Sequence, residues 1–354
     1  MNIGLLSMQR VKNYGSFWQA YCLKKILEDN RNQVEFIDII PGTTETRTIY
    51  KHTFSFSKIK RIPYYIFQKK KSQIFEQTQR DILGCNSKLN YRCNYNTIII
   101  GSDEVFNFVQ DSPWGFSSQL YGNIDNENVN SYAACFGCTT INDIEKKNVR
   151  KEIISAFDNL KHISVRDNNS AEIVKALTGI MPDIHLDPVL IGDLPLEELP
   201  KLDLGRYILV YSYDFRFSDK LLIEKIKQLA KTENCKIYSV GFYQDWCDKN
   251  IVPTPIQLLS YFRQAQYVIT DTFHGTIFSV RCHKKFVTII RESNQQKLGD
   301  LLNRLGLHSR IVCEIDDLTG ALNKEIDYGA FEKLRQAERS RTEEYLCKCI
   351  NKER

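Results

Sequence analysis

The sequence feature that most constrains the fold is a repeated alternation of short apolar runs with segments of helical periodicity. Nine runs are apolar almost throughout: 3–6, 34–37, 97–100, 131–135, 163–165, 207–211, 236–240, 267–270 and 286–290. Such continuous runs are typical of parallel strands that are covered on both faces. Apolar residues at helical spacing lie between them, at 17–28, 143–160, 218–231, 276–282 and 297–305. This alternation predicts a doubly wound α/β architecture.

The alternation is interrupted by a segment rich in proline, glycine and acidic residues at 192–205. A chain of 354 residues holds about two domains at roughly 150 residues each. We therefore predict an N-terminal domain at 1–195, a C-terminal domain at 205–325 and a cleft between them. A charged helix within 326–354 is expected to pack back across the surface. Ligands of such sheets bind beyond the carboxyl ends of the strands, so candidate residues are sought there.

Composition and motifs argue against several classes of function. A formal net charge of +5 is too small to indicate a nucleic-acid partner. No apolar stretch approaches the roughly 20 residues that span a bilayer, and the N-terminus lacks the basic segment of a signal peptide. We therefore expect a cytoplasmic protein whose 11 cysteines are reduced, and we interpret the CxxC pair Cys135 and Cys138 as small residues at a strand end rather than a redox or zinc site. No phosphate loop, dinucleotide fingerprint or HExxH pair occurs, so neither a metal nor a cofactor is predicted.

One segment departs from the α/β pattern and is predicted to be an insertion at 47–75. Between residues 47 and 71 it carries eight basic residues and no acidic ones, interleaved with aromatic residues. Basic and aromatic side chains together can hold a protein at an anionic membrane surface, which would place this chain at the inner face of the cell membrane. The alternative is a solvated insertion whose aromatic residues pack on the first domain.

The densest cluster of polar residues lies between the run at 267–270 and the helical segment that follows it. Asp271 and His274 are expected in a turn at the carboxyl end of a strand, with a helix beginning near Thr276. The free amides of Gly275 and Thr276 would then form a site for a phosphate or carboxylate, and the histidine can donate a proton near neutral pH. The alternative is that Asp271 caps the helix and His274 packs beside it.

Three further junctions carry candidate residues. Arg166 closes an apolar run, where its planar cation suits a carboxylate or phosphate, although a salt bridge to Asp167 or Asp183 explains it equally well. Asp103 follows another run and could bind sugar hydroxyls, act as a base or cap a turn. The third junction is the loop at 13–16, for which helix capping competes with ligand binding.

These segments, taken in order, resemble the motifs of the polysaccharide pyruvyl transferase family. They are Asn13-Tyr-Gly-Ser with Gln19-Ala-Tyr, Gly101-Ser-Asp-Glu-Val-Phe-Asn, Ser131-Tyr-Ala-Ala-Cys-Phe-Gly, Ile163-Ser-Val-Arg-Asp, Asp187-Pro-Val-Leu, Asp271-Thr-Phe-His-Gly-Thr-Ile-Phe-Ser and Lys297-Leu-Gly-Asp-Leu-Leu. Their order and spacing match the family from residue 1 to about residue 310. In place of the family's usual glutamine and tryptophan after Gly-Ser-Asp, this chain has Glu104 and Phe106, a change that bears on acceptor contacts.

The resemblance implies two Rossmann-like domains arranged as in glycosyltransferase-B enzymes around an interdomain cleft. It implies that phosphoenolpyruvate, as a substrate, donates its pyruvyl group to two hydroxyls of a sugar. The product would be a pyruvate ketal on a cell-surface polysaccharide, for example of a capsule or exopolysaccharide, or on its lipid-linked precursor. Two alternatives stay open: a nucleotide-sugar glycosyltransferase of the same layout, and a relative that binds glycans without turnover.

The resemblance also assigns roles to residues. The donor-binding arginine and histidine of the family correspond to Arg166 and His274, and a further basic residue corresponds to Lys297, with Arg291 as the competing candidate. Asp103 and Asp271 are the candidates for taking hydroxyl protons or orienting the histidine. The candidate acceptor contacts are Asn13, Tyr14, Gly15 and Ser16.

Overall fold

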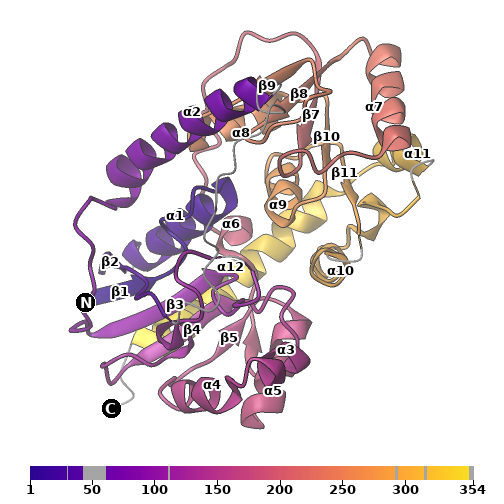
Figure 1. The fold of residues 1–354 in the computed structure, drawn as a ribbon. Helices are drawn as coiled ribbons and strands as arrows, with labels where there is room; N and C mark the ends of the chain where they lie inside the picture. The colour runs from indigo at the N-terminus through magenta and orange to yellow at the C-terminus, as the bar shows by residue number, and fades with distance from the viewer. Residues whose placement is uncertain (30, 43–60, 111, 292–293, 315–316, 351–354) are drawn as a thin grey trace.

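The computed structural model describes residues 1–29, 31–42, 61–110, 112–291, 294–314 and 317–350, which contain two parallel sheets of six strands each (Figure 1). The predicted fold class is therefore confirmed. Neighbouring residues of one strand enter different apolar clusters, Ile99 in one and Ile98 and Ile100 in the other. Both faces of the sheet are thus covered, which is why its strands are apolar runs without polar alternation.

The first sheet is formed by the chain before residue 185, and all of its pairings are parallel. In spatial order its strands are β2 (Gln33–Ile37), β1 (Asn2–Leu6), β3 (Thr97–Asp103), β4 (Val129–Ala134), β5 (Ser164–Val165) and β6 (Asp183–Ile184). The register sets Leu6 of β1 opposite Ile37 of β2 and Ile100 of β3. The carboxyl ends of these strands therefore share one edge.

The second sheet has its own series of strands from residue 207 onward, again all parallel. In spatial order they are β12 (Ile311–Val312), β11 (Phe286–Ile289), β10 (Tyr267–Thr270), β7 (Tyr207–Tyr211), β8 (Lys236–Val240) and β9 (Lys249–Ile251). The nine predicted strands are all present. The three that the sequence did not reveal, β6, β9 and β12, have only two or three residues each, too few for a periodic pattern.

Helices connect the strands in both halves. Those of the first half are α1 (Tyr14–Glu28), α2 (Ile62–Thr78), η3 (Gln79–Leu83), η4 (Ser118–Tyr121), α3 (Ile141–Lys146), α4 (Arg150–Phe157), α5 (Asn168–Thr178) and α6 (Pro188–Ile191). Those of the second half are α7 (Lys220–Thr232), α8 (Pro255–Gln264), α9 (Phe273–Arg281), α10 (Gln295–Arg304), η5 (His308–Arg310), α11 (Leu318–Asn323) and α12 (Tyr328–Ile350). The single helix expected at 143–160 is two, α3 and α4, because Asn148 between them adopts a left-handed φ of 54°.

The two halves share buried surface rather than meeting only through a linker. One apolar cluster contains residues of α1 together with residues of α8 and α9. The indole of Trp18 donates to the carbonyl of Pro255 at 3.2 Å, and the hydroxyl of Tyr14 donates to the carbonyl of Pro253 at 2.8 Å. These contacts hold α1 against the second half and fix how the two sheet edges face each other.

The C-terminal helix α12 returns from the second half to the first sheet, as the yellow helix in Figure 1 shows. Its Tyr345 hydroxyl donates to the carbonyl of Ser131 at 2.7 Å. Its Thr342 hydroxyl lies 3.1 Å from that of Tyr132, with both groups buried. The helix therefore ties the end of the chain to β4.

Candidate functional site

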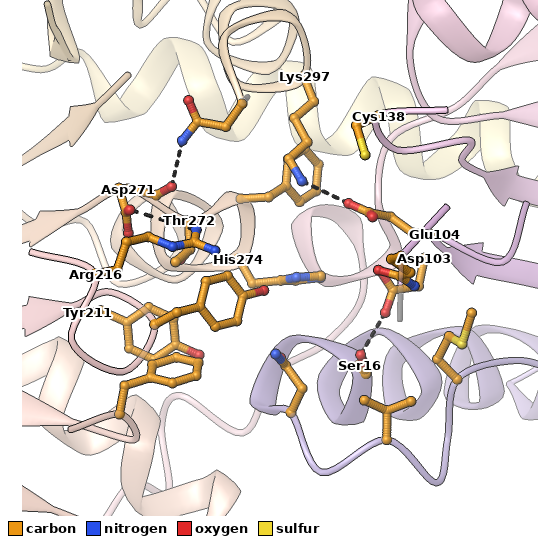
Figure 2. Close-up of a pocket in the computed structure, with 18 of the residues that line it drawn as sticks. Ser16, Asp103, Glu104, Cys138, Tyr211, Arg216, Asp271, Thr272, His274 and Lys297 are labelled. Atoms are coloured by element: carbon orange, nitrogen blue, oxygen red, sulfur yellow. Dashed lines mark hydrogen bonds and ion pairs between the residues drawn. The ribbon is translucent and has the colours of Figure 1, made fainter. Parts of the chain in front are cut away.

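A cavity of about 430 Å³ lies where the carboxyl ends of strands from both sheets meet. From the first half it is lined by residues that follow β1, β3 and β5, and from the second half by residues that follow β7, β8 and β10. Figure 2 shows Asp271 and Arg216 on one side, Asp103 and Glu104 on the other, and His274 between them. The full lining is Met8, Val11, Asn13, Ser16, Asp103, Glu104, Gln110, Cys138, Arg166, Tyr211, Tyr213, Arg216, Phe242, Asp271, Thr272, Phe273, His274, Asn294 and Lys297.

Arg166 follows β5 in the first half and His274 lies in the first turn of α9 in the second half, and both meet at one carboxylate, that of Asp187. The guanidinium of Arg166 donates to Oδ2 of Asp187 at 2.9 Å, and Nε2 of His274 lies 3.4 Å from the same oxygen. Asp187 is the N-cap of α6, and its other oxygen accepts from the amide of Val189 at 2.9 Å. The expectation that Arg166 and His274 share a site agrees with this geometry, although the partner of Arg166 is neither Asp167 nor Asp183.

The electrostatics of this group keep Asp187 ionised. Burial acts to raise the pKa of Asp187, but the charges of His274 and Arg166 outweigh it, so its pKa lies below the ordinary value. The guanidinium of Arg166 also lies 4.2 Å from the ring centre of Phe273. Among the described residues, Nε of Arg166 is buried without a hydrogen-bond partner, and Nε2 of His274 has only the 3.4 Å ion-pair contact with Asp187. Buried polar atoms are rarely left unmet, so a bound ligand would complete this array.

Asp103 lies beside the same arginine. One of its oxygens accepts a hydrogen bond from the hydroxyl of Ser16 at 2.7 Å, and the other lies 3.7 Å from Arg166. Its φ of 73° is in the left-handed region, which non-glycine residues seldom adopt outside functional sites and turns. Ser16 thus contacts a predicted candidate, and both line the cavity.

A salt bridge between Glu104 and Lys297 crosses from one half to the other. Nζ of Lys297 donates to Oε1 of Glu104 at 2.8 Å, and the other oxygen of Glu104 accepts from Asn107 at 2.7 Å. Burial acts to raise the pKa of Glu104, but Lys297 and Arg166 lower it to about 2. Of the two basic candidates, Lys297 lines the cavity, whereas Arg291 is not among its described lining residues.

Asp271 is paired with arginines instead of capping a helix. It forms an ion pair with Arg291, and Arg216 lies 3.8 Å from the same oxygen. Burial raises the pKa of Asp271 above its ordinary value, although the charges of Arg291 and Arg216 act in the opposite direction. Its carbonyl accepts from Asn294 at 2.8 Å. Asp271 therefore pairs with Arg216 and Arg291 beside the cavity. Among the described residues, it forms no hydrogen bond with His274.

The predicted anion site at Gly275 and Thr276 is wrong, because α9 begins three residues earlier than expected. Thr272 is the N-cap, and its hydroxyl accepts from the amide of Gly275 at 2.9 Å, while the amide of Thr276 donates to the carbonyl of Thr272 at 3.1 Å. A Cβ on Gly275 would lie 2.2 Å from the hydroxyl of Thr270, so this glycine permits close packing on β10. Among the described residues, the first-turn amides of α9 that have neither a helical carbonyl nor the cap side chain as partner are those of Phe273 and His274.

The loop at 13–16 contributes to the site in three different ways. Asn13 caps α1 by accepting from the amide of Gly15 at 2.8 Å, and it also lines the cavity. A Cβ on Gly15 would lie 2.2 Å from Nδ1 of His274, so the glycine lets the N-terminus of α1 contact the imidazole. Tyr14 is fully buried and bonded to Pro253, so its assignment as an acceptor contact is wrong.

Two charged residues of the site, Asp187 and Arg216, were given no role by the sequence. Asp187 lies in the segment Asp187-Pro-Val-Leu, which was one of the family-like motifs. Its position just after a strand could have indicated a site residue, but that strand, β6, was not predicted. Arg216 lines the cavity from the loop after β7, so the rule that ligands bind at strand carboxyl ends could have found it. Its guanidinium lies 4.3 Å from the ring centre of Tyr213.

The described part of the basic aromatic insertion packs on both halves of the molecule: Phe75 contacts Tyr14 of the first half with ring centres 4.8 Å apart, and the aromatic residues before it contact the second half. Tyr64 contacts Phe215 and Tyr243 with ring centres 5.0 and 5.7 Å apart, and Phe67 contacts Tyr243 at 5.6 Å. The remainder of the predicted 47–75 segment, up to residue 60, lies outside the described residues. Within the described part of the chain, no helix combines the length and apolarity needed to cross a bilayer.

Cys135 and Cys138 differ in environment. Cys135 is buried and donates to Asp167 at 2.9 Å, and burial raises the pKa of its thiol, whereas Cys138 is exposed at the cavity. Across the described ranges, no group of three or more His, Cys, Asp or Glu side chains is arranged to hold a metal ion.

Comparison with known proteins gives a family and a fold. The model of the polysaccharide pyruvyl transferase family matches residues 13–293. Similar solved structures include UDP-GlcNAc 2-epimerase from Neisseria meningitidis, with 10% identity, a TM-score of 0.50 and coverage of 98% of this chain and 100% of that one. The glycosyltransferase SnogD from Streptomyces nogalater has 10% identity, a TM-score of 0.44 and coverage of 99% of each chain. No curated protein matches. At such identities the likeness to solved structures concerns the fold alone.

Proposed function

This chain belongs to the polysaccharide pyruvyl transferase family, and we propose that it transfers the pyruvyl group of phosphoenolpyruvate to two hydroxyls of a sugar, forming a pyruvate ketal. The acceptor is a cell-surface polysaccharide or its lipid-linked precursor. The observation that carries the proposal is the buried array in which Arg166 and His274, from different halves of the molecule, both face Asp187 at the wall of one cavity.

The array has the groups that such a donor needs. Phosphoenolpyruvate carries a carboxylate and a phosphate on neighbouring positions, so its site must supply several hydrogen-bond donors and positive charge. Arg166 has an unmet Nε–H, and α1 and α9, which are 15 and 9 residues long, both begin at the cavity beside His274. Helix N-termini attract anions through their free amides and dipoles. Lys297 adds a further cation at 2.8 Å from Glu104.

The proposed reaction begins with protonation of the donor's methylene carbon by the imidazolium of His274, which makes the central carbon electrophilic. One sugar hydroxyl oxygen then bonds to that carbon and gives up its proton, which restores the proton that the histidine lost. The second hydroxyl oxygen bonds to the same carbon, the bond to the phosphate oxygen breaks, and phosphate leaves with the electron pair and the second proton. We assign to Asp103 the role of accepting a hydroxyl proton, which is supported by its position at the cavity, where its oxygens lie beside Ser16 and Arg166.

The direct test incubates the protein with phosphoenolpyruvate or with nucleotide sugars, and with free and lipid-linked sugar acceptors. Mass spectrometry of the acceptor and a phosphate assay are then read together. The proposal predicts that the acceptor gains the mass of one pyruvic acid less one water, with one phosphate released per transfer. Transfer of a sugar from a nucleotide sugar, or binding of phosphoenolpyruvate without any turnover, would contradict it.

The protein is further proposed to work in the cytoplasm against the inner face of the membrane. Ile62 and Ile66, with 50% and 64% of their surface exposed, lie on the face of α2 that also carries exposed Lys69 and Lys70. Apolar and basic side chains on one helix face suit anionic lipid. The doubly substituted Ile62→Ser and Ile66→Ser protein should sediment less with anionic vesicles than the unsubstituted protein, and equal sedimentation would contradict the contact.

A further inference from the structure

The two walls of the cavity carry opposite charge. Among the described side chains that line the cavity or form an ion pair with a lining residue, and leaving His274 aside, the first half contributes one cation and three carboxylates, and the second half contributes three cations and one carboxylate. The members from the first half are Arg166, Asp103, Glu104 and Asp187, and those from the second half are Arg216, Arg291, Lys297 and Asp271. An anionic group entering the cavity is therefore attracted to the second wall.

Arg216 is the lining cation that is least neutralised. Arg166 and Lys297 have carboxylate partners at 2.9 and 2.8 Å, whereas the nearest carboxylate to Arg216 is Asp271 at 3.8 Å. Asp271 is itself held more closely by Arg291. The side chain of Arg216 is 39% exposed, against 3% for Arg166 and 26% for Lys297. Its charge is therefore the most available to a ligand.

The position of Arg216 is restrained although its charge is available. Its guanidinium lies over the ring of Tyr213 at 4.3 Å, a contact that stabilises a cation while leaving its N–H groups free. Figure 2 places it beside Asp271 and Thr272, the N-cap of α9, and directed toward His274. A guanidinium next to free amides at a helix N-terminus is an arrangement that binds a phosphate.

We propose that Arg216 binds the phosphate of the donor and determines its preference for a phosphorylated enol over an unphosphorylated keto acid. This inference rests on the proposed function and assigns it a residue that neither the sequence motifs nor the family match indicates. The arginine binds the phosphate while it is esterified and stabilises the charge that gathers on its oxygens as the bond to carbon breaks.

The test compares the unsubstituted protein with Arg216→Gln and Arg216→Lys by calorimetry, using phosphoenolpyruvate, inorganic phosphate and oxalate as probes. Arg216→Gln should weaken binding of phosphoenolpyruvate and of phosphate by about 10- to 100-fold, because hydrogen bonds to charged groups are lost. Binding of oxalate, which has no phosphate, should change less than about threefold. Arg216→Lys should fall between, since an ammonium keeps the charge but not the planar fork.

The matched control is Arg206→Gln, which removes an exposed arginine paired with Glu233 at 3.3 Å, before β7 and thus at the opposite edge of the sheet. It should leave all three affinities unchanged. If Arg216→Gln is folded, by circular dichroism and thermal unfolding, and still binds phosphoenolpyruvate normally, the inference is wrong. An equal loss for oxalate also overturns it. Failure of the unsubstituted protein to bind or turn over phosphoenolpyruvate would instead overturn the proposed function.

Discussion

The two walls of the cavity differ in how they hold charge. On the first wall, Arg166 and Asp187 are 3% and 0% exposed and are bonded to each other at 2.9 Å. On the second wall, Arg216 and Arg291 are 39% and 33% exposed and share the single carboxylate of Asp271. Removing a buried partner leaves a charge that water cannot reach, whereas an exposed cation can be solvated again. The buried pair of the first wall therefore suits a role in holding side chains in fixed positions. The exposed arginine of the second wall suits a role in which a ligand replaces Asp271 as its partner.

The direction of the pKa shifts agrees with this contrast. The pKa of Asp187 is lowered because His274 and Arg166 together outweigh the effect of burial, while the pKa of Asp271 is raised because burial outweighs the arginines. The first carboxylate is thus stabilised as an ion by its surroundings, and the second is not. The variants below test whether this difference controls activity and stability.

The largest effect is expected for His274→Ala, which removes the proposed proton donor where the two walls meet. A positioned acid contributes about 10²- to 10⁴-fold, so the rate of ketal formation should fall by that factor while the thermal unfolding midpoint changes little. His283→Ala is the control, since that histidine is 46% exposed and pairs with Glu332 away from the cavity. Unchanged turnover in His274→Ala would remove the residue from the reaction.

The next effect compares the two carboxylates by substitution. Asp187→Asn removes the closer charge partner of the buried Arg166, leaving among the described residues only Asp103 at 3.7 Å, and should lower the free energy of unfolding by about 3–5 kcal/mol. Asp271→Asn should cost less than about 1 kcal/mol, because its partly exposed arginines regain water. Chemical denaturation of both variants measures the difference. Equal losses would show that the two walls do not differ in the way described.

The smallest effect concerns the salt bridge that joins the walls. The pKa of Glu104 is about 2 in the folded protein, where burial raises it and Lys297 and Arg166 lower it further, against about 4.3 in an unfolded chain. A lowered pKa contributes stability above the unfolded value, and that stability is lost as the pH falls from about 4.3 toward 2. The difference in unfolding free energy between the unsubstituted protein and Glu104→Gln should be about 3 kcal/mol at pH 7.

That difference should shrink below pH 4, which denaturation at pH 7, 5, 4 and 3.5 would follow. A difference that stays constant over this range would mean that the bridge does not stabilise the folded protein. The control is Glu145→Gln, which removes an exposed partner of Arg150 on the surface of the first half and should change stability little at any of these pH values.

The sequence predicted the regular parts of the fold because their signals are local. Apolar runs such as 97–100 and 207–211 are buried on both faces and can be read without knowing their neighbours. The start of α9 was placed three residues too late, because the residues from Asp271 onward were expected in a turn, whereas the side chain of Thr272, and not that of Asp271, caps a helix that begins at Phe273. Aspartate and threonine are both good N-cap residues. In the folded protein the side chain of Asp271 forms an ion pair with Arg291, which is distant along the chain, and Thr272 is left to cap the helix.

The sequence predicted where the site lies, but it did not predict which side chains form ion pairs and hydrogen bonds there. Arg166, His274, Asp103 and Lys297 all line one cavity, as their places at strand ends suggested. The partner of Arg166 could not be read from the sequence, because Asp167, Asp183 and Asp187 are all close along the chain and only the folded loop after β6 selects Asp187. Tyr14 was misassigned because the sequence does not show that α1 packs against the second half.

The most direct test of the account is a calorimetric titration of phosphoenolpyruvate into the unsubstituted protein and into Arg166→Lys. A lysine keeps the positive charge but cannot form the bidentate hydrogen bonds of a guanidinium. Arg166 is the tested residue because it lines the cavity and pairs with both Asp187 and Asp103. The account predicts binding to the unsubstituted protein and at least about a tenfold weaker affinity in the folded variant. Equal affinity in the two proteins would contradict the claim that this array holds the donor.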